Sequence, residues 1–303
     1  MPVNPHLILR SVELALNARD APAFISAVAE ANSLIKFLKT QSRIPSMRLH
    51  AVNHTTGIPK AVLFRVLEES YQRSVAPEAS RLQKTGPDPA FAYGELSLPL
   101  LYDIIQQAQL THRSIFLDLG SGVGNVVAQA SLQTGCTSYG IEINRFSASV
   151  AQVHQRVFEE RCALWGVQSG PVELECGDIT KSTRLKELLI EADVIFVNNE
   201  RFGPALNQTL VQMFSSLKEK ALVITLQPLG MSVHCTFTDR DIIKENIIPF
   251  CITKHTFHPG DVTWTYKEQN CFFYVHRVNR REHSRARCRQ KISTILQTTR
   301  WPV

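Results

Sequence analysis

Hydrophobic residues along the chain follow two periodicities in turn, and their order predicts an α/β fold. Five short runs predict strands, at residues 115–119, 137–142, 172–176, 192–197 and 221–226. The runs at 115–119 and 192–197 are continuous and apolar, as in buried strands, whereas 172–176 alternates between apolar and acidic residues. Apolar residues at helical spacing separate these runs, most clearly over 145–164, 182–191 and 207–217. This alternation predicts a parallel sheet with right-handed crossovers, in which ligands bind at the carboxyl ends of the strands.

The regions on either side of this core show other patterns. Helical spacing dominates the first 85 residues and predicts a helix over about 60–75, followed by a Pro/Gly-containing linker over 76–90. After residue 230, short β-type runs predict antiparallel strands at the sheet edge, at about 232–238, 249–257 and 271–278. We therefore expect three parts: a helical N-terminal region (1–85), an α/β domain (86–280) and a basic C-terminal tail (281–303).

A glycine-rich turn follows the first predicted strand and suggests a nucleotide-like ligand. Gly120, Gly122 and Gly124 remove Cβ atoms between this strand and the next helix, so a ligand can approach the N–H groups that open the helix. Asp118 lies just before the first glycine, where a carboxylate repels phosphate and favours a cationic group. The turn therefore favours S-adenosylmethionine over a nicotinamide dinucleotide, whose pyrophosphate would occupy the same place.

Two further acids end predicted strands. Glu142 closes the second strand, where its carboxylate is suited to accept both ribose hydroxyls of either cofactor. Asp178 follows the third strand, about where an adenine amino group can be bonded, with Ile179 against the ring. All three acids are expected at one rim of the sheet.

Composition supports a globular protein and gives no sign of a metal site. The chain has 303 residues, of which 44% are hydrophobic and 20% charged. No apolar run reaches the length of a membrane span, and the first residues lack the features of a signal peptide, so we expect an intracellular soluble protein without a membrane partner. The seven cysteines are scattered without a C-x-x-C pair, and the ten histidines form no H-E-x-x-H motif.

Charge is distributed unevenly along the chain. Residues 91–230 carry 10 Lys/Arg against 14 Asp/Glu, whereas residues 231–303 carry 12 against 6. Between Arg277 and Lys291 there are seven basic residues and one acid. An acidic ligand-binding domain with basic flanks suits a polyanionic or nucleoprotein partner, with a solvated tail as the alternative interpretation of the basic run.

Several motifs together resemble the disruptor-of-telomeric-silencing family of histone lysine methyltransferases across about residues 90–280. These motifs are Tyr93-Gly94-Glu95, the run from Asp118 to Asn125, Gly140-Ile141-Glu142, Gly177-Asp178, the run from Val194 to Asn199, and Phe202-Gly203-Pro204. The resemblance implies a class I, Rossmann-like methyltransferase fold of the seven-strand type rather than a SET domain. It also implies S-adenosylmethionine as cofactor, and a nuclear chromatin regulator involved in telomeric silencing. The implied substrate is a lysine in the globular core of histone H3 on nucleosomes, with DNA contacts through the basic C-terminal run.

The resemblance also implies roles for individual residues. The cofactor-binding set is Glu95, Leu96, Asp118, Gly120, Gly122, Asn125, Glu142, Asp178, Ile179 and Asn198. Within it, the loop of Glu95 closes over the methionine end, and Asn198 lies near the transferred methyl group. The catalytic set around the lysine channel is Asn198, Tyr93, Trp264 and Phe273.

Three departures from the family pattern leave alternatives open. The pair Glu200-Arg201 stands where the family usually has apolar residues, Ile179 stands where Phe is common, and extra residues between Trp264 and His276 align Phe273 with the channel aromatic. One alternative is a class I methyltransferase that acts on a non-histone protein or RNA. Another is a cofactor-binding chromatin adaptor with weakened catalysis.

Overall fold

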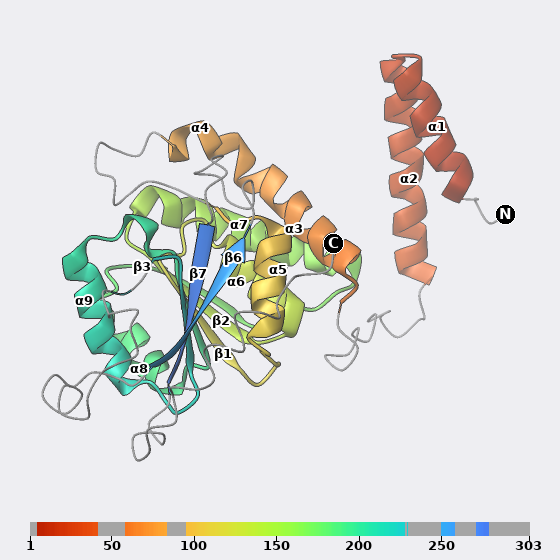
Figure 1. Ribbon diagram of the computed structural model, residues 1–303. Helices are drawn as coiled ribbons and strands as arrows, with labels where there is room; N and C mark the ends of the chain where they lie inside the picture. The colour runs from red at the N-terminus through yellow and green to blue at the C-terminus, as the bar shows by residue number, and fades with distance from the viewer. Residues whose placement is uncertain are drawn as a thin grey trace, which may run out of the picture. The chain divides into compact units, whose positions relative to one another are not determined.

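The chain divides into two compact units, residues 1–51 and 52–303. The structure, a computed structural model, describes residues 5–41, 58–83, 95–227, 229, 250–257 and 271–278. In the first unit, α1 (Pro5–Asn17) and α2 (Ala21–Gln41) form a helical hairpin (Figure 1). Asp20 caps α2 by accepting a hydrogen bond of 3.0 Å from the backbone N–H of Ala23. The helical pattern predicted for this stretch is confirmed.

The second unit contains a seven-stranded sheet in the order β3-β2-β1-β4-β5-β7-β6 (Figure 1). Its strands are β1 (Ile115–Leu119), β2 (Thr137–Glu142), β3 (Val172–Cys176), β4 (Val194–Val197), β5 (Leu222–Thr225), β6 (Phe250–Phe257) and β7 (Cys271–Val278). The first five strands are parallel, and β7 lies antiparallel to both β5 and β6. This arrangement confirms the predicted class I methyltransferase fold. The strand order reverses between β1 and β4, which is where ligands bind in such sheets.

Helices cover both faces of the sheet. Those after residue 95 are α5 (Leu98–Gln107), α6 (Asn125–Thr134), α7 (Arg145–Trp165), α8 (Thr183–Glu191) and α9 (Pro204–Met213), with the short 3₁₀ helices η4 (Asn199–Arg201) and η5 (Phe214–Ser216). The helix predicted over 207–217 begins three residues earlier, because Gly203 and Pro204 start it rather than end the preceding loop. Proline is favoured in the first helical turn, where no N–H partner is lost.

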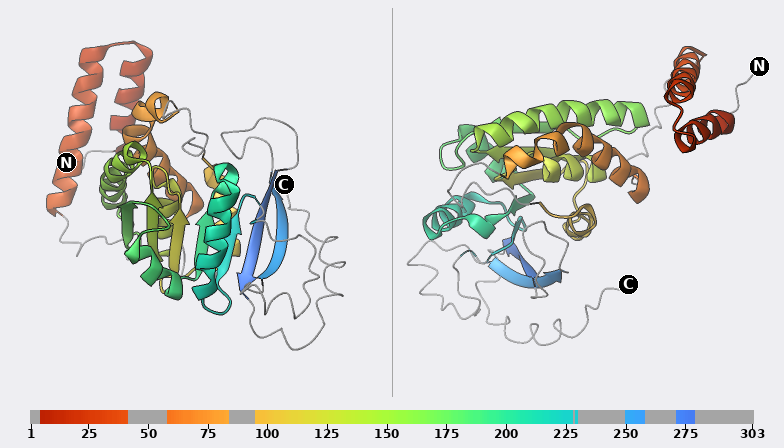
Figure 2. Two further views of the ribbon diagram at one scale, coloured as in Figure 1. Left: turned by 90° about the vertical axis from the view of Figure 1, so that its left-hand side faces the viewer. Right: turned by 90° about the horizontal axis from the view of Figure 1, so that it is seen from above.

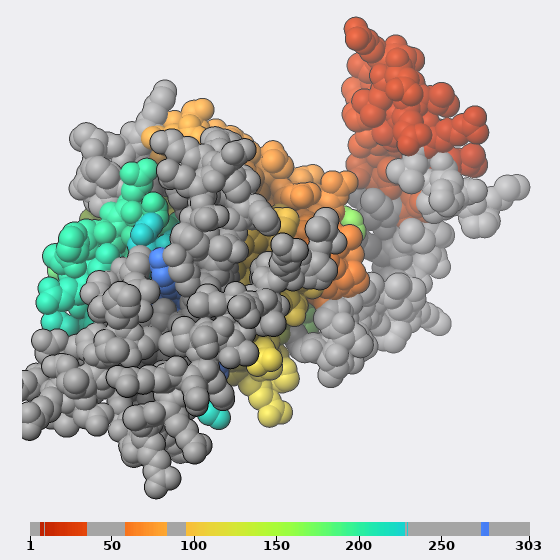
Figure 3. All heavy atoms as spheres, in the orientation of Figure 1, coloured from red at the N-terminus to blue at the C-terminus, as the bar shows by residue number. Residues whose placement is uncertain are grey.

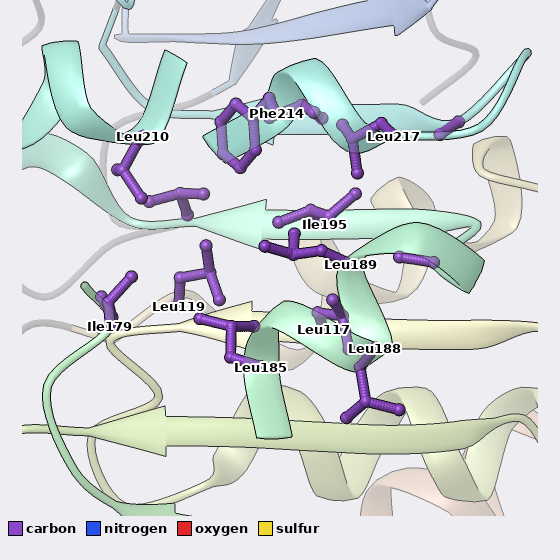
Figure 4. Close-up of a cluster of buried hydrophobic side chains, with 14 of the residues drawn as sticks. Leu117, Leu119, Ile179, Leu185, Leu188, Leu189, Ile195, Leu210, Phe214 and Leu217 are labelled. Carbon is purple, nitrogen blue, oxygen red and sulfur yellow. The ribbon is translucent and has the colours of Figure 1, made fainter. Parts of the chain in front are cut away.

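Alternation along the central strands divides the core between these two faces. Leu117, Ile195 and Val223 belong to a buried cluster with α8, α9 and η5 (Figure 4). Their neighbours Phe116 and Phe196 belong to a second cluster, which packs against α5. Side chains on a strand alternate between faces, so consecutive apolar residues predict a sheet buried on both sides. The apolar runs found in the sequence have this cause.

Helix α3 (Lys60–Ser74) packs against α7 and belongs to the second unit (Figure 2). Its residues Leu63 and Val66 are fully buried. The division of the chain after residue 51 therefore differs from the boundary predicted at residue 85, because the apolar face of α3 is buried by α6 and α7.

The prediction of a linker over residues 76–90 is wrong for residues 76–82. Residues 76–82 form η2 (Ala76–Glu78) and α4 (Ala79–Leu82). Pro77 occupies the first turn of η2, where proline is tolerated, and Leu82 is fully buried in a cluster with Val123. A proline signal in this stretch thus marks the start of a helix rather than a break.

Figure 3 shows that α3, α4 and α9 reach the surface of the second unit. No helix within the described ranges is long and apolar enough to cross a membrane. The strand predicted at about 232–238 and the basic tail of residues 281–303 lie outside the described residues.

Candidate active site

The carboxyl end of β1 turns into α6 through residues 120–124. Gly120, Gly122 and Gly124 have positive φ angles of 88°, 55° and 79°, a region in which other residues are strained. A Cβ atom on Gly120 would lie 3.1 Å from Cζ of Phe202, so glycine also allows the segment after β4 to pack against the turn. The predicted glycine turn is confirmed, and it lies where the strand order reverses.

Asp118 and Glu142 lie together beside this turn. Asp118 is 2% exposed, and its burial together with the charge of Glu142 raises its pKa well above the usual value. The carboxylate of Glu142 accepts backbone hydrogen bonds from Gly122 (2.9 Å) and Asn144 (2.7 Å). Burial nevertheless raises the pKa of Glu142, because it outweighs these bonds. A cationic ligand would stabilise these two carboxylates, of which Asp118 is buried and Glu142 half-buried.

Glu95 is fixed from two directions. Asn125, at the start of α6, donates a side-chain hydrogen bond to its Oε1 atom. The hydroxyl of Tyr71, from α3, donates to its Oε2 atom at 3.0 Å. Burial raises the pKa of Tyr71, as do the charge of Glu95 and this hydrogen bond, so the phenol stays protonated as a donor. The carboxylate therefore has a defined position beside the glycine turn.

Asp178 lies just after the end of β3 and has a polar environment. Its Oδ1 atom accepts hydrogen bonds from the backbone N–H (2.8 Å) and hydroxyl (2.7 Å) of Thr180, and the Nζ atom of Lys181 lies 3.2 Å from Oδ2. These contacts lower the pKa of Asp178, chiefly through the Thr180 hydroxyl and backbone. Its neighbour Ile179 is buried against α8 and β1 (Figure 4).

The two asparagines after β4 have different surroundings. Asn199 is 1% exposed, and its side-chain oxygen accepts from the backbone N–H groups of Leu226 (3.1 Å) and Gln227 (2.8 Å). Its amide donates to the carbonyl of Gln227 (3.0 Å) and to the side chain of Asn207 (3.2 Å). Asn199 thus joins the ends of β4 and β5, whereas Asn198 is half-buried and lines the cavity described next.

A single cavity of about 680 Å³ brings the predicted cofactor-binding residues together. All ten line it: Glu95, Leu96, Asp118, Gly120, Gly122, Asn125, Glu142, Asp178, Ile179 and Asn198. They come from separate strand ends and loops, which lie close together because the parallel strands end at the same edge of the sheet. The structure thus places every described member of that set at one site.

Acidic side chains dominate the charge of this cavity. Its acids are Glu68, Glu95, Asp118, Glu142, Asp178 and Glu200. Arg201 is the one Lys or Arg among the lining residues that the structure describes. Within the same described residues, no group of three His, Cys, Asp or Glu side chains is placed to hold a metal ion. The cavity therefore favours an organic cation over a phosphate-bearing ligand.

The cavity also contains residues that sequence reasoning did not identify. Tyr71 contributes through Glu95, and its only signal in the sequence is its place four residues after Leu67 on one helical face. His154 is 2% exposed, and its Nδ1 atom donates a 2.9 Å hydrogen bond to the carbonyl of Val123 behind the glycine turn. Burial lowers the pKa of His154, so it is a neutral residue that supports the turn.

Three of the four predicted catalytic residues lie wholly or partly outside the described structure. Tyr93 and Trp264 are not among the described residues. Phe273 lies in β7, paired with His255 of β6, and its side chain is outside the described part. Asn198 is the fourth, and it lines the cavity.

Comparison with known proteins agrees with this geometry. Residues 71–278 match the family described as histone methylation protein DOT1. The chain belongs to this family. The DOT1 relatives it resembles include the "Histone-lysine N-methyltransferase, H3 lysine-79 specific" of Chaetomium globosum, which is 35% identical over 261 residues, or 85% of this chain and 49% of that protein. The protein of the same name from Gibberella zeae is 36% identical over 262 residues, or 85% of this chain and 52% of the relative.

The DOT1 match covers only part of these relatives. The chain spans about half the length of the curated relatives it matches, as in Eremothecium gossypii, where 88% of this chain aligns with 45% of the protein at 34% identity. Solved structures are more distant. An O-methyltransferase from Bacillus cereus in complex with SAH has 18% identity and a TM-score of 0.44, covering 71% of this chain and 91% of its own. The family assignment accordingly rests on the sequence match.

Proposed function

We propose that this chain is an S-adenosylmethionine-dependent histone lysine N-methyltransferase, and that its substrate is a lysine in the globular core of histone H3 on nucleosomes. The observation that carries the proposal is the acid-lined cavity at the point where the strand order reverses. Membership of the DOT1 family and the names of its relatives support the histone substrate. A nuclear location and nucleosomal partners follow from this substrate and are part of the proposal.

The residues present fit S-adenosylmethionine. When bound, this cofactor supplies an electrophilic methyl group on a positively charged sulfonium and carries no phosphate. Glu142 is held by two backbone N–H groups, so its carboxylate is suited to the ribose hydroxyls. Asp178 and Ile179 offer an acceptor and an apolar surface for the adenine. Asp118, Glu95 and Asn125 surround the glycine turn, where the methionine end would lie.

The chain's contribution to catalysis is alignment and exclusion of water. Methyl transfer to an amine needs no strong base, since the main requirement is an in-line approach of a neutral nitrogen. Asn198 lies at the carboxyl end of a central strand and borders the cavity, so it is suited to position the acceptor nitrogen. We assign Tyr93, Trp264 and Phe273 to the channel that desolvates the lysine, because an apolar channel favours the neutral amine.

The proposal extends to the organisation of the chain. Residues 86–280 form the catalytic domain together with α3 and α4, the hairpin of the first unit is a helical annex, and residues 281–303 form a basic tail that contacts DNA or the histone surface. Seven Lys/Arg against one acid between residues 277 and 291 support this last assignment.

Calorimetry and methylation assays test the proposal separately. We expect S-adenosylhomocysteine, but not NAD, to bind the purified protein. With tritiated S-adenosylmethionine, we expect label on histone H3 in recombinant nucleosomes, and mass spectrometry should map it to one lysine of the globular core. Binding of NAD without S-adenosylhomocysteine would refute the cofactor assignment. Label on free histone or RNA but not on nucleosomes would refute the substrate.

A second candidate function deserves the same assays. Glu200 and Arg201 line the cavity, where an apolar pair would suit a lysine stem better, and this favours a related methyltransferase acting on a non-histone protein or RNA. The same pair suits a chromatin adaptor that binds cofactor without turnover. Transfer to RNA supports the first of these functions, and cofactor binding with no transfer to any substrate supports the adaptor.

A further inference from the structure

Glu200 is an acid of the cavity that the cofactor assignment leaves unused. It lies in η4, two residues after Asn198, and lines the same cavity as Asn198 and Phe202. The proposed cofactor contacts already use Glu95, Asp118, Glu142 and Asp178. Glu200 therefore needs a separate explanation.

The position of Glu200 is fixed by the turn after β5. Asn199 makes two hydrogen bonds to the backbone of Gln227, at 2.8 and 3.0 Å, and so fixes this residue beside η4. The side chain of Gln227 then donates to Oε2 of Glu200. The buried side-chain amide of Asn199 thus fixes the backbone of Gln227 beside η4. The side-chain amide of Gln227, a neutral donor, in turn holds the carboxylate of Glu200.

Glu200 has no counter-ion among the residues that the structure describes. It forms no ion pair with any other residue that the structure describes, its neighbour Arg201 included. The other charged groups that line the cavity are Glu68, Glu95, Asp118, Glu142, Asp178 and Arg201. Five of these six are acids, so acidic groups outnumber basic ones among the described residues that line the cavity with Glu200. A half-buried carboxylate held in place without a counter-ion is suited to bind a cation from outside.

We infer that Glu200 binds the ammonium group of the substrate lysine as it enters the cavity, and that it is a specificity-determining residue for cationic substrates. The inference rests on the proposed function, because it takes the acceptor to be an amine. A carboxylate near the ammonium favours capture but raises the pKa of that group, which opposes loss of the proton before transfer. Glu200 thus improves substrate binding and sets the pH above which the amine reacts.

The test compares Glu200→Gln, Glu200→Asp and the matched control Glu160→Gln, which changes an exposed acid on α7. Steady-state methylation of recombinant nucleosomes is measured from pH 6.5 to 9.5, and the affinity for S-adenosylhomocysteine is measured by calorimetry. For Glu200→Gln we expect KM for the nucleosome to rise about fivefold, the loss expected for one partly screened charge pair. We expect the acid limb of the kcat profile to move to lower pH, with the affinity for S-adenosylhomocysteine unchanged.

Glu200→Asp and the wild type serve as references that separate the role of the Glu200 charge from other effects. Glu200→Asp keeps the charge, so its acid limb should stay at the wild-type pH, and Glu160→Gln should resemble the wild type throughout. An unchanged KM and pH profile in Glu200→Gln overturns the inference. A fall in S-adenosylhomocysteine affinity that the aspartate variant does not restore also overturns it, because the residue would then act on the cofactor or on local structure. If the wild type itself transfers no methyl group to nucleosomes, the proposed function fails rather than the role of Glu200.

Discussion

The hydrogen bond from Tyr71 to Glu95 should determine how tightly the cofactor binds. Replacing Tyr71 with Phe removes the hydroxyl that lies 3.0 Å from Oε2 of Glu95 and keeps the ring, which packs against the cluster around Val123. Glu95 would retain Asn125 as a partner, but with one donor fewer its carboxylate would be held less firmly beside the glycine turn. The variant therefore tests whether a helix before the sheet positions a cofactor ligand.

The expected loss of cofactor affinity in Tyr71→Phe follows from the strength of a hydrogen bond to a carboxylate. A hydrogen bond to a charged, half-buried acceptor contributes about 1–2 kcal/mol, so S-adenosylhomocysteine should bind about 5- to 30-fold more weakly. The pKa of Tyr71 is raised by burial and by Glu95, so its hydroxyl stays protonated at and below the usual tyrosine pKa of about 10. The difference between variant and wild type should accordingly be the same at pH 7 and pH 9.

Calorimetry with S-adenosylhomocysteine measures this difference directly. Tyr102→Phe is the matched control: Tyr102 lies on α5, its ring packs edge-on against Phe64, and it does not line the cavity. It should bind S-adenosylhomocysteine like the wild type. If Tyr71→Phe binds as tightly as the wild type while Glu95→Gln does not, the reasoning about Tyr71 is refuted, and Glu95 keeps its position without this hydrogen bond.

Three further predictions concern stability and nucleosome binding. Asn199→Ala should lower the free energy of unfolding by about 2–4 kcal/mol in urea titrations, because the buried N–H of Leu226 and the part-buried N–H of Gln227 lose the oxygen that accepts from them; an unchanged midpoint would contradict this. Asp118→Asn should raise the melting temperature of the cofactor-free protein more at pH 8 than at pH 5, because an acid with a raised folded pKa loses stability as pH rises through that pKa, and it should weaken S-adenosylhomocysteine binding. Equal shifts at both pH values would rule out charge as the cause. Replacing the five arginines between residues 280 and 289 with Ala should weaken nucleosome binding and flatten its salt dependence, and unchanged binding at low salt would show a solvated tail.

The sequence predicts the sheet well because the signal is local. Strands β1, β4 and β5 are short apolar runs, as the two buried faces of a parallel sheet require. The edge strand β3 instead alternates between apolar and acidic residues, which is also a local strand signal. The site residues Asp118, Glu142 and Asp178 follow from the same reasoning, since parallel strands place their carboxyl ends at one edge.

Other features depend on contacts between distant parts of the chain. Tyr71 meets Glu95 only because α3 packs on α6 and α7, and no local pattern marks that contact. Asn199 and Gln227 are 28 residues apart in sequence, and their hydrogen bonds follow from the pairing of β4 with β5. Proline and glycine signals predict a linker over residues 76–90, because these signals do not show that the side chain of Leu82 is buried in the folded chain.

Helix α3 has a practical consequence for how the protein is cut into fragments. The family match starts at residue 71, near the carboxyl end of a helix that begins at Lys60. A fragment that starts at the match would lack Leu63, Val66 and Leu67, whose side chains are almost fully shielded from solvent. Such a fragment would leave part of α6 and α7 uncovered and would deprive Tyr71 of the helix that carries it. The shortest fragment expected to fold and bind its ligand starts before residue 58. The first residue of the family match is therefore not the first residue of the folding unit.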